Sequence, residues 1–132
     1  MFKKEVPKIQ PTNLSQQAIS TVIASEIEIT GDIKGTNTIR IDGKVTGNIT
    51  IDSGIILGEN AYVDGSLNSK TIIIYGTLKG NLTCDELQLR STGKVEGDLN
   101  VKSLEVEIGG KYNGKVNMSA NHKIIESNLE KV

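Results

Sequence analysis

Three stretches decide the fold: GKVTGNITI at residues 43–51, GTLKGNLTC at residues 76–84 and GKVEGDLNV at residues 93–101. Each has two glycines four residues apart, with an apolar residue between them and two more at alternate positions after the second glycine. A phosphate-binding loop would need Ser or Thr after its Gly-Lys pair, whereas Val or Tyr follows here. The glycine pairs therefore do not encode a nucleotide site.

The same pattern repeats along most of the chain. Its second glycine occurs at Gly35, Gly47, Gly65, Gly80, Gly97 and Gly114, and the first of these intervals is shorter than the others. Positions two before, two after and four after this glycine are almost all apolar, and the positions between them are polar, which predicts strands with one buried face. We expect the glycine itself at a corner that requires positive φ or close backbone approach.

A repeat of about 17 residues is shorter than a propeller blade or a helical hairpin, and it fits one turn of a β-solenoid. The sequence thus predicts an all-β fold, a parallel β-helix of about six windings, with two or three short strands in each. Asp64, Lys79 and Glu96 alternate in sign along one outward position, which favours stacking in register. We expect the β-helix over residues 22–118, between flexible polar tails at residues 1–21 and 119–132.

Composition limits the functional classes. The formal net charge of −1 and the isoelectric point near 5.8 argue against a nucleic-acid partner, which would require a basic face. The single cysteine, Cys84, excludes an internal disulfide and is expected to be buried and unreactive. There is neither a secretory signal nor an apolar run long enough to span a bilayer, so the sequence predicts a cytoplasmic protein.

Two rival functions remain open at this stage. Hexapeptide-repeat acyltransferases are also β-solenoids, but they need a histidine base in a cleft, and His122 in the polar C-terminal tail is the only histidine. We therefore expect no enzyme, no metal and no cofactor. The other rival is a monomeric β-solenoid that binds through a flat face, as ice-binding proteins do with regular threonine arrays. Here the threonine array is interrupted, because Thr50 and Thr83 alternate with Asn68 and Asn100.

The two ends of the β-helix are candidate polymerisation surfaces. An uncapped solenoid exposes core and unpaired backbone at each end, and the sequence contains no evident amphipathic capping helix. The candidate interface residues are Ile27, Ile29 and Ile33 at one end and Tyr112, Val116 and Met118 at the other.

The N-terminus carries a candidate membrane-binding segment formed by Met1, Phe2, Lys3 and Lys4. An aromatic residue beside lysines can attach weakly to anionic lipid, at about 1 kcal/mol for each basic residue near the surface. Many copies on one polymer would strengthen this binding through avidity.

Residues 21–118 closely resemble the bactofilins, most specifically in IRIDGKVTGNI at residues 39–49 and LQLRSTGKVEGDL at residues 87–99. The resemblance implies a right-handed β-helix that assembles end to end, head to head and tail to tail, into nonpolar filaments without nucleotide. It further implies attachment to the cytoplasmic face of the inner membrane through the N-terminal tail. As partners it implies cell-wall synthases, hydrolases or their adaptors, held on a scaffold that determines cell shape. Two departures from the regular pattern, the first interval and Tyr112, lie near the ends.

Overall fold

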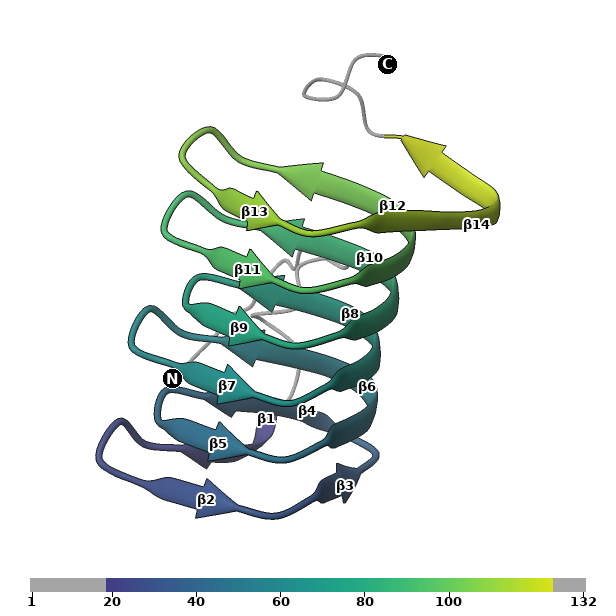
Figure 1. Cartoon of the computed structure of the whole chain (residues 1–132). Helices are drawn as coiled ribbons and strands as arrows, with labels where there is room; N and C mark the ends of the chain where they lie inside the picture. Colours follow the sequence, from purple (N-terminus) through teal and green to yellow (C-terminus); the bar gives the residue numbers. More distant parts are fainter. Residues whose placement is uncertain (1–18, 125–132) are drawn as a thin grey trace, which may run out of the picture.

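Two parallel β-sheets wind around one core (Figure 1). The computed structural model describes residues 19–124, and no helix occurs among them. Each full winding adds one strand to each sheet, so the smaller sheet has six strands. The expected all-β solenoid of about six windings is confirmed.

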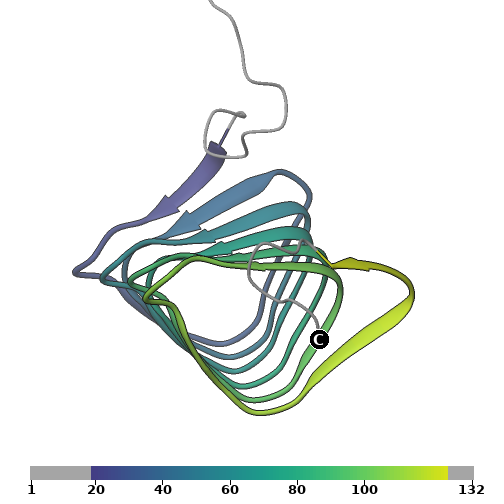
Figure 2. The ribbon, with the colours of Figure 1, turned by 90° about the horizontal axis from the view of Figure 1, so that it is seen from above.

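The larger sheet has the order β1-β4-β6-β8-β10-β12-β14, with β3 beside β6. Its strands are β1 (Ile19–Ile23), β3 (Ile33–Gly35), β4 (Thr38–Ile41), β6 (Ile49–Leu57), β8 (Leu67–Ile74), β10 (Leu82–Leu89), β12 (Leu99–Val106) and β14 (Val116–Ile124). The smaller sheet consists of β2 (Glu28–Thr30), β5 (Lys44–Thr46), β7 (Tyr62–Asp64), β9 (Thr77–Lys79), β11 (Lys94–Glu96) and β13 (Lys111–Asn113). Seen along the axis, the windings superimpose in one outline, from which β14 swings outward (Figure 2).

Aliphatic side chains from successive windings stack into inward columns, as the alternation predicted. One column from the smaller sheet contains Ile29, Val45, Val63, Leu78, Val95 and Tyr112. A column from the larger sheet contains Ile33, Ile49, Leu67, Leu82, Leu99 and Val116. The four interior members of each column are at most 1% exposed, whereas the first and last members are only partly covered. Burial therefore decreases toward both ends of the stack.

The first winding is regular, which corrects the alignment made from the sequence. That alignment placed Gly35 at the first corner, with a short interval to Gly47. In the structure β2 pairs with β5, so Gly31 is the residue that lies against Gly47 in the next winding. Gly35 instead ends β3 and pairs with Ile51. The strand register defines the repeat, and Ile33-Lys34-Gly35 only imitates the apolar-polar-glycine pattern that precedes a corner.

The strands also extend past the boundaries expected at residues 22 and 118. β1 begins at Ile19 and pairs with β4. At the other end, β14 continues to Ile124, with its register against β12 shifted after Met118. Backbone pairing extends both ends of the sheet into segments whose side chains show no clear apolar alternation.

The corner glycines let one winding lie directly on the next. Gly80 has φ of 141°, and its amide donates to the carbonyl oxygen of Glu96 at 2.8 Å. A Cβ atom built at Gly80 would lie 1.8 Å from the carbonyl oxygen of Gly65 in the preceding winding. Only glycine fits this corner, because the conformation is strained for other residues and backbone occupies the space of a side chain.

We expect Gly80→Ala to lower the free energy of unfolding by more than about 3 kcal/mol, since it adds a backbone clash to the strain of positive φ. Gly31→Ala is the matched control: Gly31 has φ of 133° but no atom within 4 Å of its added Cβ. This control should cost only about 1–2 kcal/mol. Urea denaturation followed by circular dichroism at fixed protein concentration measures both. Equal losses would show that close approach of the windings is not what requires glycine.

Cys84 lies in the inward column with Val101 and is 6% exposed. Burial raises the pKa of its thiol well above the ordinary value, and the neighbouring carboxylates of Asp85 and Glu86 act in the same direction. The reactive species is the thiolate, so a buried neutral thiol is a poor nucleophile.

We expect a thiol reagent at neutral pH to modify native Cys84 at least about 100-fold more slowly than the same thiol in the urea-unfolded chain. Thr83→Cys in a Cys84→Ser background is the control, because Thr83 is the exposed neighbour on the same strand. The control thiol should react at nearly the unfolded rate. Rapid modification of native Cys84 would contradict its place in the core.

Candidate functional site

The two ends of the solenoid are the candidate site, because the stack of strands stops there without a cap among the described residues. β2 and β13 are the edge strands of the smaller sheet, and β1 and β14 are the last strands of the larger one. An edge strand presents unpaired N–H and C=O groups and is a ready template for another chain. Figure 1 shows the two ends facing away from each other along the axis.

The N-terminal end brings together the three residues that the sequence analysis assigned to it. Ile29 and Ile33 pack against the core and are only partly buried, since they lie in the first strand of each column. Ile27, in the turn before β2, is 47% exposed. Val22, which is 60% exposed in β1, also lies at this end and was not identified from the sequence. Its position could have been recognised from the sequence, because Ile23 faces the core and the preceding residue in the strand must therefore face outward.

The C-terminal end carries Tyr112, Val116 and Met118. Tyr112 closes the column of the smaller sheet, and its hydroxyl donates to the carbonyl oxygen of Gly97 at 3.3 Å. Burial raises the pKa of this phenol, and the charge of Asp98 adds to the effect, so it stays a neutral donor at physiological pH. Val116 is 39% exposed, and Met118 packs half-buried against the core.

Ile108 is the most exposed large apolar residue at this end, at 92%, and the sequence analysis also missed it. It lies in the turn between β12 and β13. In the preceding winding, the equivalent turn position is Ser91, whose backbone amide donates to Glu107 Oε1 at 2.8 Å. Alignment of the turns could have identified Ile108, because an isoleucine stands in the last turn where the preceding turn has a serine.

The outward charges differ in sign between the two ends. Glu28 begins the column that Lys111 ends, and Glu28 Oε2 lies 3.8 Å from Lys44 Nζ. Asp32 and Lys115 stand directly after the first and last corner glycines. The N-terminal end is therefore acidic at positions where the C-terminal end is basic.

Within the stack, the predicted charge ladder is present in register. Asp64, Lys79 and Glu96 occupy one column, and Lys79 Nζ lies 3.9 Å from Glu96 Oε1. Both side chains are about half exposed, so this pair contributes at most about 1 kcal/mol. It guides register more than it stabilises the fold.

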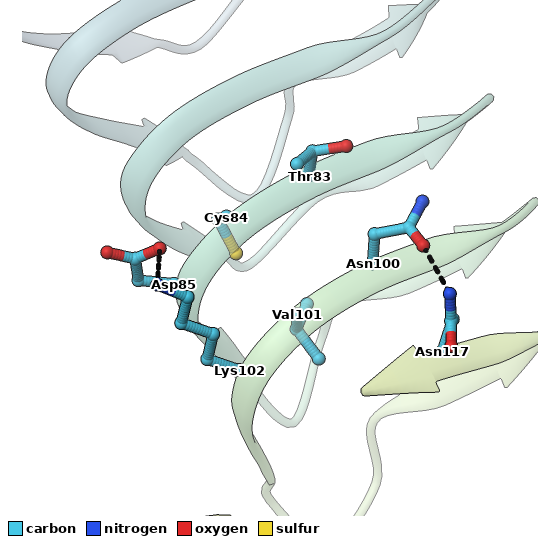
Figure 3. Close-up of a pocket in the computed structure, with 7 residues that line it drawn as sticks. All are labelled: Thr83, Cys84, Asp85, Asn100, Val101, Lys102 and Asn117. Carbon is cyan, nitrogen blue, oxygen red and sulfur yellow. Dashed lines mark hydrogen bonds and ion pairs between the residues drawn. The ribbon is translucent and has the colours of Figure 1, made fainter. Parts of the chain in front are cut away.

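A polar ladder follows the side of the solenoid to its C-terminal end. Asn117 Nδ2 donates to Asn100 Oδ1 at 3.0 Å, with Thr83 one winding further (Figure 3). Two residues further along the same strands, Lys102 Nζ lies 3.6 Å from Asp85 Oδ1. The groove between these strands has a volume of about 160 Å³ and is lined by residues of β10, β12 and β14. Asn117 is the last residue of this ladder, because β14 is the last strand of the larger sheet.

Over the described range 19–124, no group of three His, Cys, Asp or Glu side chains is placed to hold a metal ion. In the same range there is no helix with the length and apolar character needed to cross a membrane. His122 lies in β14. The candidate membrane-binding residues Met1, Phe2, Lys3 and Lys4 lie outside the described residues.

Comparisons with known proteins agree with this arrangement. A protein-family model described as "Bactofilin: Polymer-forming cytoskeletal" matches residues 21–117. The chain is 29% identical over 77 residues to bactofilin BacO of Myxococcus xanthus (strain DK1622), a match that covers 58% of this chain and 61% of that relative. No solved structure matches the chain. Since the family match extends from β1 into β14 and so takes in every winding of the solenoid, the chain belongs to the bactofilin family of polymer-forming cytoskeletal proteins.

Proposed function

We propose that this cytoskeletal protein assembles end to end into filaments in which the solenoid continues from one molecule into the next. The observation that carries this proposal is the state of the two ends. Each combines edge strands with apolar side chains that the chain's own windings leave partly uncovered. A neighbouring molecule would complete both the sheets and the core.

Apolar burial and strand pairing are the driving forces in this proposal. Full burial of an exposed Val, Ile or Met side chain contributes about 1.5–3 kcal/mol, and each end offers several such side chains. Backbone hydrogen bonds to the edge strands add direction. Because these interactions need no phosphate chemistry, assembly should proceed without nucleotide.

Like ends meet in the arrangement that we propose, which makes the filament nonpolar. A two-fold axis through Tyr112 would pair β13 with its copy in the antiparallel sense, so that Lys111 lies opposite Asn113 instead of another lysine. The same operation through Ile29 places Glu28 opposite Thr30. The opposite charges of the two ends favour the alternative, a polar head-to-tail filament, but exposed ion pairs contribute little.

The test uses one charged substitution at each end, because the two arrangements respond differently. Val116→Arg should block only the C-terminal contact, so that a nonpolar assembly stops at dimers joined through their N-terminal ends. The double variant Ile27→Arg, Val116→Arg should be monomeric. Thr50→Arg, on the exposed side of β6, is the control and should leave filaments intact. Light scattering after size exclusion and negative-stain electron microscopy give the readout.

Monomers from Val116→Arg alone would overturn the nonpolar arrangement in favour of the polar one. Filaments of normal length from the double variant would contradict end-to-end assembly itself. The circular dichroism spectrum of each folded variant should match that of the parent chain, so that a loss of filaments is not a loss of fold.

We also propose that the filament lies on the cytoplasmic face of the inner membrane, held by Met1, Phe2, Lys3 and Lys4, and there serves as a scaffold for cell-wall synthases, hydrolases or their adaptors in determining cell shape. The amino-acid sequence and the membership of the bactofilin family support this part of the proposal. Weak single attachments become strong when many are joined in one polymer.

Removal of the aromatic residue or of the charge should separate the two contributions to lipid binding. We expect Phe2→Ser, and separately Lys3→Glu with Lys4→Glu, to abolish co-sedimentation with vesicles that contain phosphatidylglycerol. Neither change should alter filament formation. Lys70→Glu with Lys102→Glu, on the exposed sides of β8 and β12, is the control matched to the double lysine variant in charge and should leave binding unchanged. Sedimentation of the tail variants at the parent level would remove the membrane assignment.

A further inference from the structure

The corner glycine of the last winding differs from the others in its hydrogen bonding. In each earlier corner, the glycine amide donates to a carbonyl oxygen of the following winding at 2.8–3.0 Å. These bonds run from Gly31 to Thr46, Gly47 to Asp64, Gly65 to Lys79, Gly80 to Glu96 and Gly97 to Asn113. Among the described residues, no winding follows the corner at Gly114, so its amide has no such acceptor. The amide nitrogen of Gly114 is therefore open at the C-terminal end.

The residue before this glycine is also different. Threonine or a charged residue precedes the corner glycine in the earlier windings, whereas Asn113 precedes it in the last. Asn113-Gly114 is the only Asn-Gly pair in the sequence, and Asn113 is exposed at the end of the edge strand β13. Asparagine is one of the thermolabile residues. A glycine after it leaves the next backbone nitrogen without a side chain to shield it.

We propose that Asn113 is a deamidation site, and that the open end of the solenoid makes it one. In this reaction the backbone nitrogen of Gly114 loses its proton and attacks Cγ of the Asn113 side chain. The new C–N bond closes a succinimide ring, and the side-chain nitrogen takes up a proton and leaves as ammonia. Water then opens the ring at either carbonyl and gives aspartate or isoaspartate. The net change is the exchange of ammonia for water.

Stacking protects the other corners from this chemistry. Ring closure requires a rotation of the backbone that brings the glycine nitrogen to the preceding side chain. At Gly97 this rotation would break the 3.0 Å hydrogen bond to the carbonyl oxygen of Asn113 and move backbone that is packed between two windings. At Gly114 the amide has no such bond to lose, and β13 has one neighbouring strand where β11 has two. The rate follows the population of the locally opened state, which is larger for an edge strand.

Assembly would supply the acceptor that Gly114 lacks, and only this link rests on the proposed function. In the two-fold arrangement through Tyr112, Gly114 lies opposite Gly110 of the neighbouring molecule. In a head-to-tail contact, the carbonyl group of Thr30 would stand where Asn113 stands for Gly97. Either contact protects Asn113, whereas an open end leaves it reactive. Isoaspartate adds one carbon to the main chain, so a converted β13 no longer pairs in register.

The test compares two Asn-Gly pairs in one chain. Glu96→Asn places a second pair at a stacked corner of similar backbone geometry, since φ is 139° at Gly97 and 151° at Gly114. In the double variant Ile27→Arg, Val116→Arg, whose ends stay open, we expect Asn113 to convert at least about tenfold faster than the introduced asparagine. In urea both sites should convert at similar rates. Peptide mass spectrometry after incubation at mildly alkaline pH measures both, and electron-transfer fragmentation distinguishes isoaspartate from aspartate.

Equal rates at the two sites in the native chain would overturn the proposal, because an open corner would then make no difference. Filaments of the chain with unaltered ends should convert Asn113 at least about tenfold more slowly than the double variant. Equal rates in these two preparations would overturn the protection by assembly. If the unaltered ends form no filaments, the proposed function fails, but the difference between the two sites should remain. If the double variant loses the circular dichroism spectrum of the parent chain, dilute parent chain that has not assembled takes its place.

Discussion

The structure depends on the close approach of backbone to backbone at the glycine corner. At Gly47, Gly65, Gly80, Gly97 and Gly114, an added Cβ would lie within 2.2 Å of a carbonyl oxygen in the winding below. This contact holds neighbouring windings at the spacing of parallel strands, about 4.8 Å. The inward columns, the in-register charges and the polar ladder all follow from that spacing. A side chain at one corner would separate two windings and disturb every column that crosses them.

In a stack of this kind, the strand pairing that joins neighbouring windings can continue beyond the first and last windings. Its strands pair with the winding before and the winding after, and among the described residues no helix covers either end. The outermost members of each column remain partly exposed, and Val22, Ile27, Ile108 and Val116 add uncovered apolar surface. Solenoids that remain monomeric need polar caps. The interaction that builds the fold is thus also available between molecules, which links the fold to a polymer-forming family.

Much of this architecture could be predicted from the sequence. The alternation of apolar residues and the spacing of the glycines independently indicate the length of one winding and the positions that face inward. The inward positions were identified correctly, including the buried Cys84. The first corner was misplaced at Gly35 because the local pattern resembles a corner, whereas the true register at Gly31 depends on pairing with the next winding. Val22 and Ile108 were missed because their exposure depends on which turn is last. The outward-facing Ile56 and Ile73 were not distinguished from the core, because each lies in a run of apolar residues whose other members face inward.

The most direct test of continuous stacking is the diffraction pattern of aligned filaments. If the solenoid axis is the filament axis, the strands lie perpendicular to it, and the reflection at about 4.8 Å falls on the meridian. Six windings at this spacing also give an axial length of about 29 Å for each molecule, and because molecules alternate in direction in the nonpolar arrangement, the axial repeat is a pair of molecules, about 58 Å. A strand reflection on the meridian together with this axial repeat is the predicted result. A strand reflection on the equator, or an axial repeat that does not match the stacked windings, would contradict the account.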